Sequence, residues 1–171
     1  MKNHNPCVMQ DPRKQYPIDE TPYDESQPDP ALDAKLTPCA DHGEDTYQGS
    51  GRLKGRKALI TGGDSGIGRA VAIAVAREGA DVVINYLPSE ERDGRAVLDI
   101  LDAAGVNAFA VVGDISDEAF CQQLVQQTAD KLGGIDILVN NAGRQQFNES
   151  IRTLSTEDFD ATFKTNVYAM F

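Results

Sequence analysis

The sequence predicts a doubly wound α/β fold, in which helices cover both faces of a parallel sheet. Three observations in residues 51–171 lead to this prediction. Short runs that are apolar throughout recur four times, segments with helical periodicity separate them, and glycines or capping residues bound most of these segments. Strands without polar alternation, joined by helices, imply right-handed crossovers and a three-layer arrangement around the sheet.

Each element follows from its own pattern. Strands are predicted at residues 57–61, 81–86, 108–112 and 135–140. Four helices are predicted. The first has Ile67, Ala70, Val71, Ala74 and Val75 on its buried face and ends at Gly79, and the second runs from Pro88–Ser89 to Gly105. The third runs from the cap Ser116 to Gly133–Gly134, and the fourth begins with a variant capping box at Ser155–Asp158 and includes Phe159 and Phe163. We expect an incomplete sheet of strand order 3-2-1-4, with its ligand at the carboxyl ends of the strands.

A different composition marks the first 50 residues. They hold seven of the eight prolines and two of the fifteen glycines, with ten acidic and four basic residues. Repeated X-Pro steps sustain neither helix nor sheet, so we divide the chain into a Pro-rich acidic arm at 1–50 and a folded domain at 51–171. Two interpretations of the arm stay open: a disordered tail, or an extended arm that lies on a folded surface of this chain or a neighbour. Its expected anchors are Tyr16, Ile18, Tyr23, Leu32, Leu36 and Tyr47.

Composition excludes several classes of function. The 171 residues carry a net charge of −11, which disfavours nucleic acid as a partner. No apolar run is long enough to cross a membrane and the start resembles no secretory signal, so we expect a cytoplasmic protein. Cys7, Cys39 and Cys121 fit neither a disulfide framework nor a zinc motif, and the isolated His4 and His42 predict no metal site.

Glycines gather where the first strand is expected to pass into the first helix. The turn reads Thr61-Gly62-Gly63-Asp64-Ser65-Gly66-Ile67-Gly68. Such glycines allow a tight turn and let backbone N–H groups approach an anion, while the helix amino terminus favours a diphosphate. No Lys follows them as a P-loop requires, so this turn favours a dinucleotide over a hydrolysed nucleoside triphosphate.

Four short elements stand out in the sequence: Thr61-Gly62-x-x-x-Gly66-Ile67-Gly68, Gly113-Asp114-Ile115, Asn140-Asn141-Ala142-Gly143 and Lys164-Thr165-Asn166-Val167. Together they resemble the short-chain dehydrogenase/reductase family. Thr61-Gly62-x-x-x-Gly66-Ile67-Gly68 is similar to its T-G-x-x-x-G-I-G signature, and Asn140-Asn141-Ala142-Gly143 to its N-N-A-G element. Gly113-Asp114-Ile115 and Lys164-Thr165-Asn166-Val167 resemble its adenine-contacting and catalytic Asn segments. The resemblance runs from about Leu53 to Phe171, implies a Rossmann-like domain, and together with the arm points to the extended glucose/ribitol-dehydrogenase-like subgroup.

The resemblance implies a role for each matching residue. Gly62, Ser65, Gly66, Ile67 and Gly68 would surround the diphosphate and the adenosine ribose, Asp114 and Ile115 would contact the adenine, Asn141, Ala142 and Gly143 would line the ribose, and Asn166 would hold a water in the catalytic proton relay. It also implies a small-molecule alcohol or carbonyl substrate, a sugar or polyol among them, and a homotetramer for the full-length enzyme.

The choice between NAD(H) and NADP(H) falls at the end of the second strand, where a carboxylate would repel a 2′-phosphate. Asn85-Tyr86 stands there instead, and Arg69 or Arg92 is available to pair with the phosphate. Against this, Asp64 is acidic, and Ser65 stands where NADP-preferring relatives often carry a basic residue. We favour NADP(H) and leave NAD(H) open.

The catalytic Ser and Tyr-x-x-x-Lys of the family have no counterpart here. The tyrosines at 16, 23, 47 and 86 are followed four residues later by Glu20, Gln27, Gly51 and Glu90, and Tyr168 lies three residues before the end. We therefore expect the amino-terminal portion of a longer oxidoreductase, inactive alone. The alternative is a non-catalytic dinucleotide-binding or pseudo-enzyme fragment. Arg144, Gln145 and Gln146 are expected to reach the cleft, and their polarity favours a hydroxylated substrate.

Overall fold

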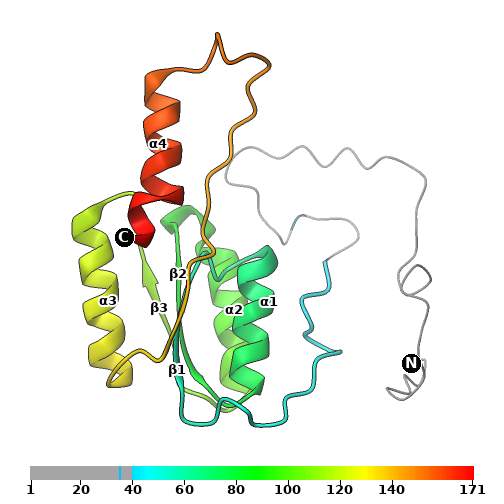
Figure 1. Ribbon diagram of the computed structural model, residues 1–171. Coiled ribbons are helices and arrows are strands. Elements are labelled where there is room, and N and C mark those ends of the chain that lie inside the picture. Colours follow the sequence, from blue (N-terminus) through cyan, green and yellow to red (C-terminus); the bar gives the residue numbers. More distant parts are fainter. Residues whose placement is uncertain (1–34, 36–39) are drawn as a thin grey trace, which may run out of the picture.

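The computed structural model describes residue 35 and residues 40–171 (Figure 1). Most of the arm predicted at 1–50 therefore lies outside the described residues. The same holds for five of its expected anchors, for two of the cysteines and for one histidine: Tyr16, Ile18, Tyr23, Leu32, Leu36, Cys7, Cys39 and His4.

Four parallel strands form the sheet in the predicted order. They are β1 (Lys57–Thr61), β2 (Asp81–Tyr86), β3 (Ala108–Val112) and β4 (Ile137–Val139), arranged β3-β2-β1-β4. The first three have the predicted bounds. The fourth is shorter than the predicted 135–140, because it pairs only with β1, over Ala58 to Ile60.

Helices cover both faces of this sheet (Figure 1). On one face α1 (Gly66–Arg77) and α2 (Glu91–Ala103) pack side by side, and the short η3 (Pro88–Glu90) leads into α2. On the other face lies α3 (Glu118–Leu132). The chain ends with α4 (Thr156–Asn166) and η4 (Tyr168–Met170), which stand near the carboxyl ends of the strands. The incomplete three-layer Rossmann-like fold is confirmed.

The buried face of α1 differs from the prediction. Gly68, Ala72, Ile73 and Ala76 are buried, whereas the predicted Ala70, Val71, Ala74 and Val75 are only half-buried. Ile67, predicted on the same face, is 77% exposed. The helix packs against the sheet, α2 and the segment that precedes β1, so burial is spread over a broad face that a single stripe does not locate.

Two helix starts were predicted from capping residues. Ser155 caps α4 as expected, its hydroxyl accepting from the backbone N–H of Asp158 at 3.0 Å. The prediction of Ser116 as the cap of α3 is wrong: Asp117 takes that place and accepts from Ala119 N at 2.8 Å. Asp114 accepts from the backbone N–H of Ser116 instead, at 2.8 Å, so the preceding turn is one residue longer.

Residues 41–52 lie against α1, and all but the last two of them were assigned to the arm from composition (Figure 1). The buried carboxylate of Glu78, at the end of α1, accepts from Tyr47 Oη at 2.6 Å, from Ser50 N at 3.0 Å and from Arg52 Nη2 at 2.6 Å. These donors hold the pKa of Glu78 well below its usual range. The described end of the arm thus meets the folded surface of its own chain, with Tyr47 as one of its anchors.

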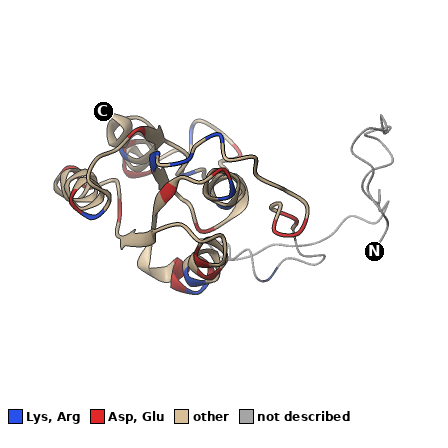
Figure 2. Cartoon of the chain, turned by 90° about the horizontal axis from the view of Figure 1, so that it is seen from below, with Lys and Arg blue, Asp and Glu red and all other residues tan. Residues whose placement is uncertain are grey.

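Charged residues follow the helices, whereas the strands are mainly uncharged (Figure 2). Among the described residues, no helix has the length and apolar character that spanning a membrane requires. Within the same residues no group of three His, Cys, Asp or Glu side chains is placed to hold a metal ion.

Candidate functional site

The glycine turn joins β1 to α1 in a conformation that needs its glycines. Gly62 and Gly66 have φ angles of 62° and 49°, in the left-handed region that disfavours other residues. A Cβ on Gly68 would lie 1.9 Å from the carbonyl oxygen of Gly62, whereas one on Gly66 would meet no atom within 4 Å. Gly68 therefore allows helix and strand to approach, and Gly66 faces open space.

The amino terminus of α1 is left open by its own side chains. Ser65 is the N-cap residue, but its side chain makes no capping hydrogen bond, and the first turn contains no acidic residue. The backbone N–H groups of a first turn lack intrahelical partners and carry the positive end of the helix dipole. This end of α1 fits a bound anion such as a diphosphate.

The residues after β4 are fastened to this turn. Thr61 Oγ1 accepts from the backbone N–H groups of Asn141 and Ala142, both at 3.1 Å. The side-chain amide of Asn141 donates to Thr61 O at 3.0 Å and to Gly62 O at 2.9 Å. Thr61 and Asn141 thus connect the two strand ends between which the strand order reverses. The Thr-Gly motif placed Thr61 in the turn without indicating this role.

Asp64 lies inside the turn and is 3% exposed. Burial, with the neighbouring carboxylates of Glu90 and Asp93, raises its pKa to about 6. Carboxylates are therefore present near the end of β2, although the strand end itself has none. They come from the glycine turn, from η3 and from α2, which sequence spacing alone did not bring together.

Asn85 and Tyr86, the candidates at the end of β2, are both buried. The amide of Asn85 donates to Val111 O and Gly113 O, each at 3.0 Å, and so connects β2 to the end of β3. Tyr86 Oη donates to Glu91 at 3.2 Å, and burial together with that carboxylate raises the pKa of Tyr86 to about 12. In this structure both side chains are engaged within the chain.

The two arginines considered for a 2′-phosphate differ in their surroundings. Arg69 pairs with Glu44 at 2.7 Å and is largely buried, so its guanidinium is engaged by the segment that precedes β1. Arg92, near the start of α2, is exposed. Sequence reasoning missed the pair of Arg69 and Glu44, because the two residues are far apart in the chain and no local pattern connects them.

Of the two candidates at the end of β3, one is exposed and the other is buried. Asp114 is exposed, and its carboxylate accepts from Ser116 N at 2.8 Å. Ile115 is 8% exposed and belongs to the apolar cluster beneath α3. Asp114 therefore lies at the open carboxyl edge of the sheet, while Ile115 is mainly a core residue.

Asn166, at the end of α4, is bound to the loop that follows β4. Its side-chain oxygen accepts from Arg144 N at 2.7 Å, and its side-chain nitrogen donates to Arg144 O at 2.8 Å. The guanidinium of Arg144 points to α4, where it pairs with Asp158 at 3.1 Å. Of the residues expected to reach the cleft, Arg144 is thus held by α4, Gln146 accepts from it at 2.7 Å, and Gln145 is exposed.

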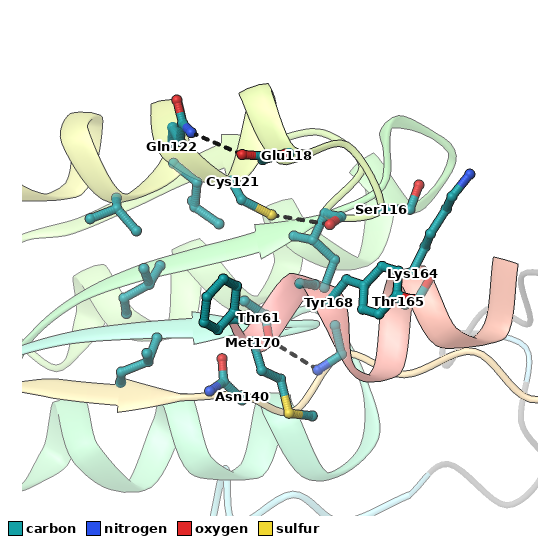
Figure 3. Close-up of a pocket in the computed structure, with 18 of the residues that line it drawn as sticks. Thr61, Ser116, Glu118, Cys121, Gln122, Asn140, Lys164, Thr165, Tyr168 and Met170 are labelled. Carbon is teal, nitrogen blue, oxygen red and sulfur yellow. Dashed lines mark hydrogen bonds between the residues drawn. The ribbon is translucent and has the colours of Figure 1, made fainter. Parts of the chain in front are cut away.

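A cavity of about 960 Å³ opens beside these strand ends (Figure 3). Thr61 and Asn140 line it from β1 and from the end of β4, Tyr168 and Met170 from η4, and Cys121 from α3. Most of the remaining lining is apolar, with Leu59, Ile115, Leu124, Val125 and Leu138 among its residues. The cavity therefore combines an apolar wall with a few polar groups near the glycine turn.

Comparisons with known proteins agree with this geometry. The family model for short chain dehydrogenases matches residues 56–171. The chain is 52% identical over 163 residues to the uncharacterized oxidoreductase YghA of Escherichia coli, covering 95% of this chain and 55% of that protein. It is 32% identical over 155 residues to the glucose and ribitol dehydrogenase of Daucus carota, covering 88% and 53%.

A solved structure is similar as well. A short chain dehydrogenase from Burkholderia cenocepacia, in complex with NADP, superposes with a TM-score of 0.66 at 43% identity, covering 69% of this chain and 47% of that one. The chain therefore belongs to the short-chain dehydrogenase family of oxidoreductases. It spans about half the length of the curated relatives that it matches.

Proposed function

We propose that this chain carries the dinucleotide-binding part of an NAD(P)-dependent oxidoreductase, which transfers hydride between a nicotinamide cofactor and an alcohol or carbonyl compound. The observation that carries the proposal is the amino terminus of α1, which is uncapped and which the Gly62–Gly68 turn leaves open to an anion. A sugar or polyol is the proposed substrate class, supported by the likeness to a glucose and ribitol dehydrogenase.

The proposed roles follow the order of the strand ends. The backbone of Gly62, Ser65, Gly66, Ile67 and Gly68 would bind the diphosphate and the adenosine ribose, Asp114 and Ile115 would meet the adenine, and Asn141, Ala142 and Gly143 would line the ribose. Hydride acceptance and donation are the chemistry that the nicotinamide ring supplies when bound. Asn166 would hold the proton-relay water at the end of α4, next to the loop to which its side chain is bound.

We propose NADP(H) as the favoured form of the cofactor, with NAD(H) as the alternative. The NADP bound to the Burkholderia cenocepacia relative supports this choice. Asn85 and Tyr86, which end β2 without a carboxylate, support it too, whereas the carboxyl group of Asp64 nearby favours NAD(H). Arg92 is exposed and is the proposed partner of the 2′-phosphate, because Arg69 is paired with Glu44. We also propose that the full-length enzyme is a homotetramer, as the family resemblance implies.

We propose that the 171-residue chain alone binds the cofactor without catalysing the reaction, because its sequence contains no Tyr-x-x-x-Lys pair. A neighbouring ammonium is what would lower the pKa of such a Tyr for proton transfer. The purified chain, mixed with NADP⁺ and glucose or ribitol, is expected to produce no NADPH absorbance above the buffer rate. Robust polyol-dependent reduction would overturn the claim of inactivity. If no dinucleotide binds to the folded chain, the proposed function itself is wrong.

A further inference from the structure

One arginine fastens the loop after β4 to α4. The guanidinium of Arg144 donates to Asp158 O at 3.2 Å, to Asp158 Oδ1 at 3.1 Å and to Thr162 Oγ1 at 3.3 Å. It also donates to Gln146 Oε1 at 2.7 Å, within its own loop. Arg144 and Asp158 are both about 30% exposed, so water competes with the pair only in part. The planar fork of an arginine suits such a set of acceptors better than an ammonium does.

The backbone of Arg144 is held by Asn166, at the other end of α4. Both polar atoms of the Asn166 side chain are bonded to the Arg144 backbone, at 2.7 Å and 2.8 Å. Asp158 and Asn166 lie eight residues apart on α4, about two turns. A rotation or shift of α4 would therefore break hydrogen bonds at both ends, and Arg144 sets the position of Asn166 relative to the loop.

The loop is fixed at its other end by the glycine turn. Asn141 and Ala142 donate to Thr61 Oγ1, so only Gly143 separates the part held by β1 from the part held by α4. A Cβ on Gly143 would be in ordinary van der Waals contact with Asn166 Oδ1, at 3.6 Å. These hydrogen bonds connect residues 141–144 and Asn166 in one hydrogen-bonded unit.

The loop after β4 faces one of the two halves of the proposed dinucleotide. A dinucleotide at a strand-order reversal places its diphosphate at the turn after the first strand and its two halves on opposite sides. With the adenosine half toward β2 and β3, where Asp114 lies, the other half extends toward β4 and its loop. Arg144, at the end of this loop, is therefore expected next to the nicotinamide half rather than the adenosine half.

We propose that Arg144 is a positioning residue of the cofactor site: its bonds to α4 hold the loop after β4 and Asn166 in the geometry that receives the nicotinamide half. The inference rests on the proposed function. Arg144 does not act as a ligand for substrate in this arrangement, because four hydrogen bonds commit its guanidinium to acceptors within the chain.

The test compares Arg144→Met and Arg144→Lys with Arg56→Met in the 171-residue chain. Arg56 also pairs with an aspartate, Asp136 at 3.4 Å, but at the amino end of the sheet, far from the strand ends that form the site. Dissociation constants are measured by titration calorimetry for NADPH and for 2′,5′-ADP, which has the adenosine half alone. Circular dichroism melts establish that each variant is folded.

Arg144→Met is expected to weaken NADPH binding by roughly fivefold to tenfold. It is expected to leave 2′,5′-ADP binding within about twofold of the unmodified chain, since the adenosine half does not reach Arg144. The NADPH affinity of Arg144→Lys should lie between those of the unmodified chain and Arg144→Met, because lysine keeps the positive charge without the planar guanidinium. In ¹H–¹⁵N spectra the Asn166 side-chain amide should shift in Arg144→Met and stay in place in Arg56→Met.

Two results would overturn the inference while leaving the proposed function intact. One is NADPH affinity in Arg144→Met equal to that in Arg56→Met. The other is an equal loss of NADPH and 2′,5′-ADP affinity in a folded Arg144→Met chain, which indicates a general structural role. Failure of the unmodified chain to bind either ligand would overturn the proposed function, and the inference with it.

Discussion

Asp64 lies in the glycine turn, and its carboxyl group is buried. Its pKa is raised to about 6 by burial and by Glu90 and Asp93, so the folded chain keeps a proton that the unfolded chain loses near pH 4. The free energy of unfolding therefore falls as the pH rises from about 4 through about 6. Above that range the full destabilisation from ionising the buried Asp64 carboxyl group is present. The turn retains this carboxyl despite the cost, which agrees with a role in the site rather than in folding.

Replacing Asp64 with Asn removes the group that titrates while keeping its shape. Asp64→Asn is expected to be more stable than the unmodified chain, and the difference should widen by about 1 kcal/mol between about pH 5 and about pH 8. Urea unfolding followed by circular dichroism at the two pH values measures this difference. Asp102→Asn, on the exposed part of α2, is the control for the same substitution at another site. A constant difference for Asp64→Asn would contradict the assignment of the raised pKa.

At the scale of elements, the contact between residues 41–52 and α1 depends on a close backbone approach. A Cβ on Gly49 would lie 1.8 Å from the carbonyl oxygen of Arg77. Arg77 in turn donates from its guanidinium to the carbonyl oxygens of Gly43 and Glu44. The segment therefore lies directly on the backbone at the end of α1 and stabilises that end of the helix.

Gly49→Ala is expected to push this segment off α1 and to destabilise the chain by about 2 kcal/mol, a typical cost of overpacking. The measurement is the urea midpoint, with Gln48→Ala as the neighbouring exposed control. Unfolding midpoints that are equal for the two variants would show that the contact contributes nothing to stability.

The strands and the glycine turn could be predicted because their signals are local. A continuous apolar run such as 108–112 has few alternatives to a buried strand, and the Thr61–Gly68 pattern locates the turn by itself. The pairs of Arg144 with Asp158 and of Arg69 with Glu44 could not be predicted in this way. Each depends on two segments that meet only after folding, and a charged residue in a loop has no periodicity that reveals its partner.

At the scale of the whole molecule, one edge of the fold differs from the other. The predicted strand order places β4 at an edge, and Leu138 within it is 53% exposed. The large cavity lies against the same strand, whereas the layer of α1 and α2 is closely packed. The glycine turn, the Asn141 loop and Asn166 all lie at the carboxyl end of this asymmetric sheet, which is where ligands of such folds bind.

The account depends most on dinucleotide binding at the amino terminus of α1, and Gly66 allows a direct test. A methyl group there meets no protein atom within 4 Å and would occupy the space that the diphosphate needs, although the positive φ of Gly66 adds backbone strain. Gly105 is a matched control, because its φ of 79° is also positive and its surroundings are also open, but it lies after α2 at the other end of the sheet. NADPH titrations by calorimetry should give saturable binding to the unmodified chain, the same affinity for Gly105→Ala, and at least about tenfold weaker binding for Gly66→Ala. Equal affinities for the two folded variants, or no binding to the folded unmodified chain, would contradict the account.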